Sequence, residues 1–236
     1  MENLNYRNLH PSAGGSFSFG WRKMFEKAFL PLLLAVIILG ILNGPSAGTK
    51  WELDGDGGFG FPMLLLFPVV VFGLAYSFLF LPVIKYGRDL LFLNAMRDQE
   101  ADLRTLFEGF KTKYLNIILA NLIVFALIMI GVVMLIIPGI IIACRLAFVS
   151  YLVMDKNMDA MKAVEKSWQM TRGYGWTIFG MAILSFFIVI GGLIVFFVGV
   201  IVSFMWIHSA FASLYLAVSN LNDDDNPIPI LGVNEV

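Results

Sequence analysis

The chain alternates between long apolar runs and shorter polar segments, and this pattern predicts a membrane protein built from helices. A hydrocarbon core about 30 Å thick takes about 20 helical residues to cross. Six apolar runs are close to that length, at residues 25–43, 62–84, 114–137, 139–154, 176–195 and 199–219. The runs lack the apolar–polar alternation of transmembrane strands, which favours helices over a barrel. We therefore expect the fold class to be all-α, a polytopic transmembrane helical bundle of about six spans.

Turn signals divide the longest apolar stretches into hairpins. Pro138 and Gly139 form a turn dipeptide between the third and fourth runs, and proline is also tolerated at a helix start. The stretch 176–219 is almost continuously apolar and would make a single helix of roughly 66 Å, about twice the thickness of a bilayer. A turn near Gly191, Gly192 or Gly199 would divide it into two spans.

Three polar segments lead into the pairs of apolar runs, and they share a pattern. Each contains glycine followed by an aromatic residue and then apolar residues, as in "FGWRKMFEKAFL", "EGFKTKYLNIIL" and "RGYGWTIFGMAI". Apolar residues recur at helical spacing beside these stretches, for example at Phe17, Trp21 and Met24. This is typical of amphipathic helices in the membrane interface, so we expect three hairpins, each preceded by an interfacial helix. The alternative is ordinary juxtamembrane loops with an aromatic belt. The expected interfacial anchors are Trp21, Phe110, Trp168 and Trp176.

The basic residues predict the orientation. Of the 16 Lys and Arg residues, 14 lie in the N-terminal segment, in residues 85–113 or in residues 156–172. The positive-inside rule then places both termini in the cytoplasm. The expected membrane is the inner membrane of a bacterial cell. The expected organisation is a cytoplasmic segment with an amphipathic helix (1–24), a six-span membrane domain (25–220) and a disordered acidic cytoplasmic tail (221–236).

Composition excludes several classes of function. Hydrophobic residues make up 59% of the chain, and the formal net charge of −1 argues against a nucleic-acid partner. The single cysteine, Cys144, excludes an intramolecular disulfide, and the two histidines lie at opposite ends of the chain. The acidic residues of 89–108 alternate with Lys and Arg, which is typical of a solvated helix face. We therefore expect no catalytic site, no metal site and no cofactor, and a protein that is not an enzyme.

Arg145 stands out because it is a charged residue in the middle of an apolar run, whereas Glu26 and Lys27 lie at the start of theirs. A charge near the bilayer centre costs at least about 2.5 to 3.5 kcal/mol, so the guanidinium needs a partner or water. Apart from Glu26 at the very start of the first run, no Asp or Glu lies within the predicted spans. If Arg145 has a functional role, it would bind an anion or a lipid headgroup. If its role is structural, its side chain would form hydrogen bonds between helices or extend to the membrane interface. The candidate polar partners in the bundle are Asn116, Asn121, Ser185, Ser203 and His208.

The stretch "IIPGIIIACRLAFVSYLVMDKNMDAMKAVEKSWQMTRG" resembles the membrane domain of certain bacterial glycerophosphodiester phosphodiesterases and of related polytopic inner-membrane proteins. The matching residues are Pro138, Gly139, Ile140, Asp155, Ala163, Ser167, Trp168, Thr171 and Gly173. The resemblance covers about 40 residues and implies a compact helical membrane module of generally unassigned activity. In those enzymes catalysis belongs to a separate soluble domain, whose metal-binding carboxylates and histidines have no counterpart in this chain. The phosphodiesterase activity is therefore not carried over.

These observations predict a non-enzymatic integral membrane module that organises lipid or assists a partner protein. The expected partners are membrane lipids and a protein in the membrane. The alternative is a small transporter or lipid-translocating component with an anion or headgroup site at Arg145. A continuous polar cavity that reaches Arg145 would favour transport, whereas a packed bundle with an apolar groove would favour the module.

Overall fold

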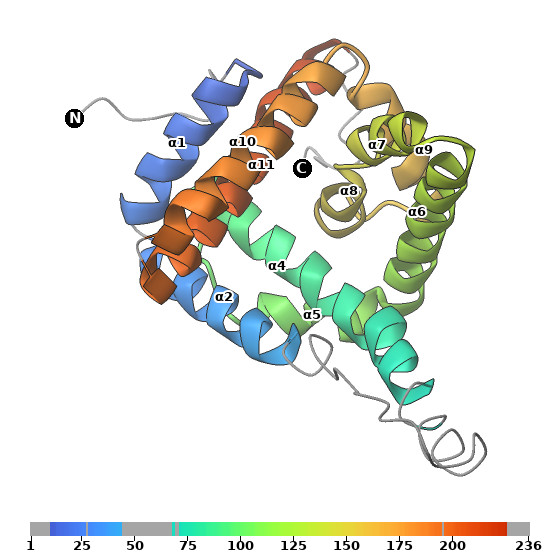
Figure 1. The fold of residues 1–236 in the computed structure, drawn as a ribbon, viewed down its shortest axis with the longest axis horizontal. Coiled ribbons are helices and arrows are strands. Elements are labelled where there is room, and N and C mark those ends of the chain that lie inside the picture. Colours follow the sequence, from blue (N-terminus) through green and yellow to red (C-terminus); the bar gives the residue numbers. More distant parts are fainter. Residues whose placement is uncertain (1–9, 27, 44–67, 69–70, 195, 226–236) are drawn as a thin grey trace, which may run out of the picture.

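The computed structural model describes residues 10–26, 28–43, 68, 71–194 and 196–225, and every regular element in these ranges is a helix (Figure 1). The all-α fold class is thereby confirmed. The predicted outer loop 44–61, the start of the second predicted span and the end of the acidic tail lie outside the described residues.

The helices follow one another along the chain with short connections. Their bounds are α1 Ala13–Glu26, α2 Phe29–Asn43, η3 Tyr76–Phe80, α4 Leu81–Met96, α5 Thr105–Thr112, α6 Tyr114–Met134, α7 Ile136–Arg145, α8 Val149–Asp155, α9 Ala160–Met170, α10 Gly175–Ile194 and α11 Phe196–Asp225.

Four helical segments are long and apolar enough to cross a membrane. They are Tyr114–Met134, Ile136–Asp155, Gly175–Ile194 and Gly199–Asn222. These segments coincide with the third to sixth predicted spans, so the chain is a membrane protein with transmembrane helices. The first predicted span, 25–43, contains the shorter apolar helix Phe29–Leu39.

The two hairpin turns lie close to the predicted positions. α6 and α7 are separated at Leu135, whose extended backbone (φ −169°, ψ 148°) breaks the helix. Pro138 lies in the first turn of α7, after the reversal, where its missing N–H costs nothing. In the second hairpin, α10 ends at Ile194, two residues beyond Gly192, and α11 begins at Phe196.

Small residues allow the second hairpin to close tightly. A Cβ atom on Gly192 would lie 2.6 Å from the carbonyl oxygen of Gly199, so only glycine fits there. The Ser203 hydroxyl on α11 donates a 3.1 Å hydrogen bond to the carbonyl of Ile188 on α10. Close backbone approach and interhelical hydrogen bonds are the usual means by which helices associate in lipid.

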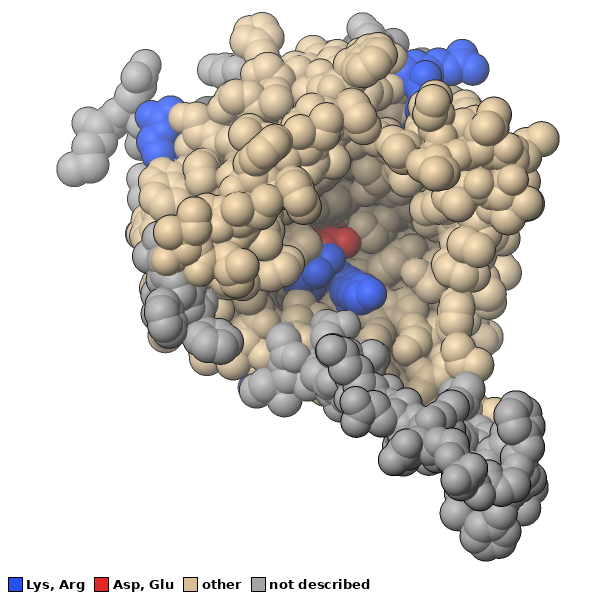
Figure 2. Space-filling model, in the orientation of Figure 1, with Lys and Arg blue, Asp and Glu red and all other residues tan. Residues whose placement is uncertain are grey.

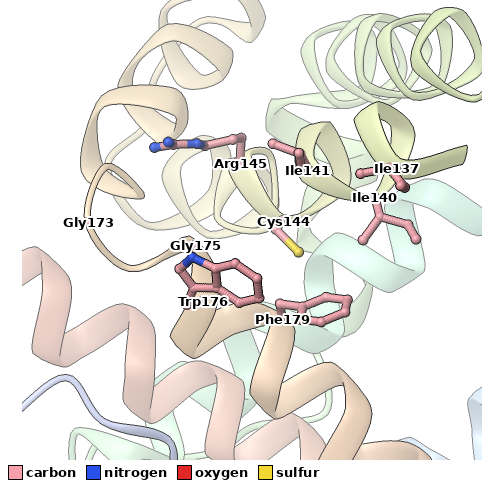
Figure 3. A pocket seen from close by; sticks show the side chains of 9 residues that line it. All are labelled: Ile137, Ile140, Ile141, Cys144, Arg145, Gly173, Gly175, Trp176 and Phe179. Carbon is pink, nitrogen blue, oxygen red and sulfur yellow. The ribbon is translucent and has the colours of Figure 1, made fainter. Parts of the chain in front are cut away.

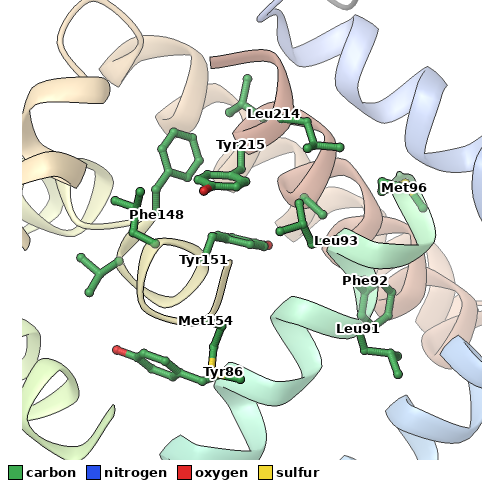
Figure 4. Packing of buried hydrophobic residues seen from close by; sticks show 14 of the residues in the cluster. Tyr86, Leu91, Phe92, Leu93, Met96, Phe148, Tyr151, Met154, Leu214 and Tyr215 are labelled. Carbon is green, nitrogen blue, oxygen red and sulfur yellow. The ribbon is translucent and has the colours of Figure 1, made fainter. Parts of the chain in front are cut away.

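α4 lies at the centre of the molecule and contacts α1, α2, α5, α6, α8 and α11. Most of its side chains are buried, including Leu91, Phe92 and Leu93. Beside it, α8 and α11 meet through an aromatic cluster (Figure 4). The rings of Tyr151 and Tyr215 stack 4.9 Å apart, and Phe148 meets Tyr215 edge-on at 5.6 Å. This aromatic and aliphatic packing holds the shorter helices around α4.

The three predicted interfacial segments form helices α1, α5 and α9, and each buries one face. α1 packs along α11, where the indole N–H of Trp206 donates a 2.8 Å hydrogen bond to the carbonyl of Phe17. Trp21 and Phe25 of α1 stay 40% and 48% exposed, which leaves an aromatic edge directed away from the core. Each helix is therefore amphipathic, with one face in the fold and another outside it.

Candidate functional site

The site around Arg145 begins with a break in a helix. α7 ends at Arg145, and α8 begins at Val149 after a turn at Leu146–Phe148. The break leaves backbone groups unpaired, and α9 supplies their partners. Hydroxyls of Ser167 and Thr171 donate to the Arg145 carbonyl at 2.9 and 3.2 Å, and the Phe148 N–H donates to the Ser167 hydroxyl at 3.3 Å. Irregular backbone at membrane depth requires such protein partners.

The Arg145 side chain extends over an aromatic ring rather than into the bundle. Its guanidinium carbon lies 5.8 Å from the ring centroid of Trp168, which is cation–π distance. The Nη1 atom is buried and has no hydrogen-bond partner among the described residues. A buried donor of this kind is rare in folded proteins because it costs free energy unless a ligand or water pairs with it.

An apolar cavity of about 450 Å³ opens beside this guanidinium. The lining residues are Ile137, Ile140, Ile141, Cys144, Arg145, Gly173, Gly175, Trp176 and Phe179 (Figure 3). Figure 3 shows the guanidinium at one end, isoleucines of α7 at the other, and the rings of Trp176 and Phe179 along one side. Arg145 is the only charged residue in the lining. The cavity therefore offers one cationic contact and otherwise apolar walls.

The part of the cavity wall formed by the turn between α9 and α10 contains Gly173. Gly173 has a φ of +88°, a conformation that residues with a side chain rarely adopt. The turn at this residue brings the start of α10, with Trp176, against α7. Sequence reasoning picked out Gly173 only through the family resemblance, and its backbone angle now gives it a structural role.

The candidate polar partners of Arg145 lie elsewhere in the described structure and make other contacts. The Asn116 amide donates to the Met158 carbonyl at 2.8 Å and accepts from the Ala160 N–H at 2.7 Å. Ser185 bonds within α10, Ser203 links α11 to α10, and the His208 ring packs 5.5 Å from Phe92.

No hydrogen bond in the described ranges joins Asn121 or these four residues to Arg145. The reason is the position of Arg145 at the C-terminal end of α7, where its side chain lies beside α9 and the start of α10.

The four predicted anchors have different surroundings. Trp21 packs 4.7 Å from Trp206, and Phe110 packs 5.2 Å from Phe80. Trp168 lies under Arg145, and Trp176 is 84% exposed at the start of α10. Two of the anchors, Trp168 and Trp176, therefore also belong to the Arg145 site.

Two charged contacts away from this site were not anticipated from the sequence. Asp155 at the end of α8 forms an ion pair with Arg97, which donates from Nη2 at 2.8 Å, and Asp155 also accepts from the Tyr215 hydroxyl at 2.9 Å. Lys23 of α1 pairs with Asp98 at 2.7 Å. Both contacts connect segments that are far apart in the sequence.

The chemistry of the described residues offers no metal site, since no group of three His, Cys, Asp or Glu side chains comes together within them. Comparisons with protein-family models, with curated proteins and with solved structures found no match. The resemblance to the phosphodiesterase membrane domain therefore stays a prediction, and the functional argument depends on the site itself.

Proposed function

We propose that this membrane protein is a non-enzymatic module that binds an anionic lipid at Arg145 and so organises lipid or assists a partner protein. The observation that supports the proposal most directly is the unpartnered guanidinium nitrogen at one end of an apolar cavity. Guanidinium groups bind phosphate through short, charge-assisted hydrogen bonds. The apolar walls would hold the part of an acyl chain next to the headgroup.

The shape of the cavity favours an amphiphile over a polar solute. Its volume of about 450 Å³ lies within the usual range of ligand pockets. A sugar or a free ion would leave its polar groups facing Ile140, Ile141 and Phe179, and unpaired polar groups are costly to bury. A lipid presents charge to Arg145 and hydrocarbon to the remaining walls. The apolar walls therefore favour the lipid-binding module over a transporter of polar solutes.

The proposed location is the bacterial inner membrane, with both termini in the cytoplasm. Support comes from the three basic segments of the sequence, since α1, α5 and α9 all derive from them. The exposed aromatic edge of α1 and the exposed Trp176 suit the headgroup region, where amphipathic rings are enriched.

A lipid-binding measurement with Arg145 variants tests the proposed function. The purified protein would be titrated in neutral detergent with phosphatidylglycerol, and bound lipid counted by native mass spectrometry. We expect Arg145→Leu to weaken binding about tenfold or more, because charge-assisted hydrogen bonds are lost. Arg145→Lys should retain part of the affinity, since it keeps the charge without the planar donor set.

The neighbouring Arg172 provides a matched control. It is exposed in the turn after α9, so Arg172→Leu removes an equal charge close by and should leave binding unchanged. Cys144 lines the cavity and is the only cysteine, so its alkylation rate reports occupancy of the same site. Equal lipid binding by wild type and Arg145→Leu, with no protection of Cys144 in either, would exclude a lipid site in this cavity.

A further inference from the structure

A second hollow lies over α4, away from the Arg145 cavity. Figure 2 shows Lys or Arg side chains beside an acidic side chain at its floor, in the region that α4 crosses in Figure 1. The charged residues of α4 are Lys85, Arg88 and Asp89. Their spacing of i, i+3 and i+4 places them on one face of the helix. This charged face of α4 lies in the region of the hollow, and we call it the charged floor.

The floor contains one internal ion pair. Arg88 donates from Nε at 3.0 Å and from Nη2 at 2.8 Å to a single oxygen of Asp89. The two side chains are only 18% and 12% exposed. A guanidinium has five N–H donors, and two of those on Arg88 donate to Asp89. The other three have no protein acceptor in the described structure.

Lys85 provides the second cation. It lies four residues before Asp89, a spacing suited to pairing, yet the carboxylate is held by Arg88. Among the described residues Lys85 makes no ion pair or hydrogen bond, and its side chain is exposed. Partial burial by the surrounding walls and then the charge of Arg88 lower the pKa of the Lys85 ammonium, while Asp89 raises it. Two cations and one carboxylate leave the floor with one excess positive charge.

The neighbouring helices contribute neutral groups. α8 and α11 both pack against α4. The His208 ring of α11 lies 5.5 Å from Phe92 of α4, and Tyr151 belongs to α8. Figure 4 shows the Tyr151 hydroxyl directed from α8 into the space beside α4. α8 and α11 thus border α4 without supplying another carboxylate to Lys85, since Asp89 is the acidic residue that acts on the pKa of this ammonium group.

We propose that this hollow is an anion site that holds a phosphate group between the Lys85 ammonium and the free N–H donors of Arg88. The phosphate belongs either to a lipid headgroup or to a soluble phosphate compound, since both present the same oxygens. A phosphate between Lys85 and Arg88 would reduce the repulsion between these two positive charges. Its oxygens would accept hydrogen bonds from the N–H groups of Arg88 that do not bind Asp89. A cation is disfavoured because the one carboxylate is already paired.

This site differs from the Arg145 cavity in its elements and its chemistry. The Arg145 cavity is formed by α7, α10 and the turn between α9 and α10, and its walls are apolar. The hollow has a charged floor on α4. The inference therefore stands independently of the proposed lipid function at Arg145, and the two sites are tested with different variants.

Lys85 is the residue to change first, because it is exposed and its removal breaks no contact in the described structure. The full-length protein in neutral detergent would be titrated with inorganic phosphate, and separately with short-chain phosphatidic acid. Binding would be followed by native mass spectrometry and calorimetry. We expect Lys85→Gln to weaken binding about tenfold or more and Lys85→Arg to preserve it.

Controls separate this site from nonspecific charge and from the other cavity. Lys162→Gln removes an exposed lysine on α9 and should bind like wild type, as should Arg145→Leu in the phosphate titration. The double variant Arg88→Gln/Asp89→Asn replaces the ion pair by neutral groups of similar size, so binding should be lost without an unpaired buried charge.

The two probes identify the source of the phosphate. Inorganic phosphate binding that depends on Lys85 would assign the hollow to a soluble phosphate compound, and binding of phosphatidic acid alone would assign it to a headgroup. The proposal is overturned if neither probe binds wild type more tightly than Lys85→Gln.

Discussion

The carboxylate of Asp155 forms polar contacts that connect α8 with α11 and with the residue that follows α4. Its carboxylate lies at the end of α8 and accepts from Arg97, which follows α4, and from Tyr215 of α11. The Asp155 side chain is 9% exposed and that of Arg97 19%. A carboxylate so far from water is tolerated only when charged and hydrogen-bonded partners surround it.

Removing this carboxylate should destabilise the fold more than removing an exposed one. We expect Asp155→Ala to lower the free energy of unfolding by about 3 kcal/mol, because it removes a buried ion pair with Arg97 and the acceptor of the Tyr215 hydroxyl. Tyr215→Phe should cost about 1.5 kcal/mol, the loss of one hydrogen bond to a charged group. The measurement is SDS-induced unfolding in mixed micelles.

Asp102 is the control for that series. Its side chain is 56% exposed and faces the 94% exposed Arg104 at 3.9 Å. Asp102→Ala should therefore change stability much less. Equal losses for Asp102→Ala and Asp155→Ala would contradict a structural role for the buried ion pair.

At the residue scale, the sequence identified Arg145 as a candidate site residue. It did not identify Lys85, Arg88 and Asp89 of α4 as a site. Arg145 was conspicuous because it interrupts an apolar run, and the structure places it beside a cavity. Asp89 looked like part of a solvated helix face, since Lys and Arg alternate with the acidic residues there. Its actual burial depends on packing against other helices, which local charge alternation does not report.

At the element scale, glycine decides how closely helices approach. α1 packs along α11, and a Cβ atom on Gly20 would lie 2.8 Å from the backbone nitrogen of Ala210. Gly14, on the same helix, has nothing within 4 Å of such an atom. The two positions differ in packing and share the same helix.

This difference gives a matched pair of variants. Gly20→Ala should lower the free energy of unfolding by about 1 to 3 kcal/mol, because overpacking forces the helices apart. Gly14→Ala should leave it unchanged or raise it slightly, since alanine favours the helix. Both would be measured by the thermal unfolding midpoint in detergent. A similar loss at both positions would mean that helix propensity, rather than contact with α11, sets the effect.

The apolar runs predicted the elements better than the breaks between them. The spans 114–137 and 176–195 match α6 and α10 to within a few residues at each end. The break after Arg145 was missed, because the residues that follow are as apolar as those before. The break is stabilised by the hydroxyls of Ser167 and Thr171, which only the tertiary structure brings to the Arg145 carbonyl.

For the whole molecule, hydropathy and charge predict a membrane protein and its orientation but not the order in which helices pack. No periodicity in the sequence indicates that α4 lies at the centre or that α1 contacts α11. Such contacts depend on glycines and buried hydrogen bonds in segments distant along the chain. The bond between Trp206 and Phe17, for example, spans 189 positions.

The proposed orientation can be tested by labelling single cysteines in cells. In a Cys144→Ser background, Lys162→Cys on the exposed face of α9 should react with an impermeant maleimide only after lysis, because α9 belongs to a basic segment. Lys50→Cys, in the predicted outer loop, should react in intact cells. The reverse pattern would invert the assigned orientation.

The contact between α1 and α11 also affects how the protein is made. A ribosome releases α1 well before α11, so the face of α1 that carries Phe17 and Gly20 has no partner during most of synthesis. That surface stays without its partner until the hairpin of α10 and α11 has been made. The contact between α1 and α11 can therefore form only after α11 has been made, and a chain stalled before this step would expose the unpaired face of α1 to proteases.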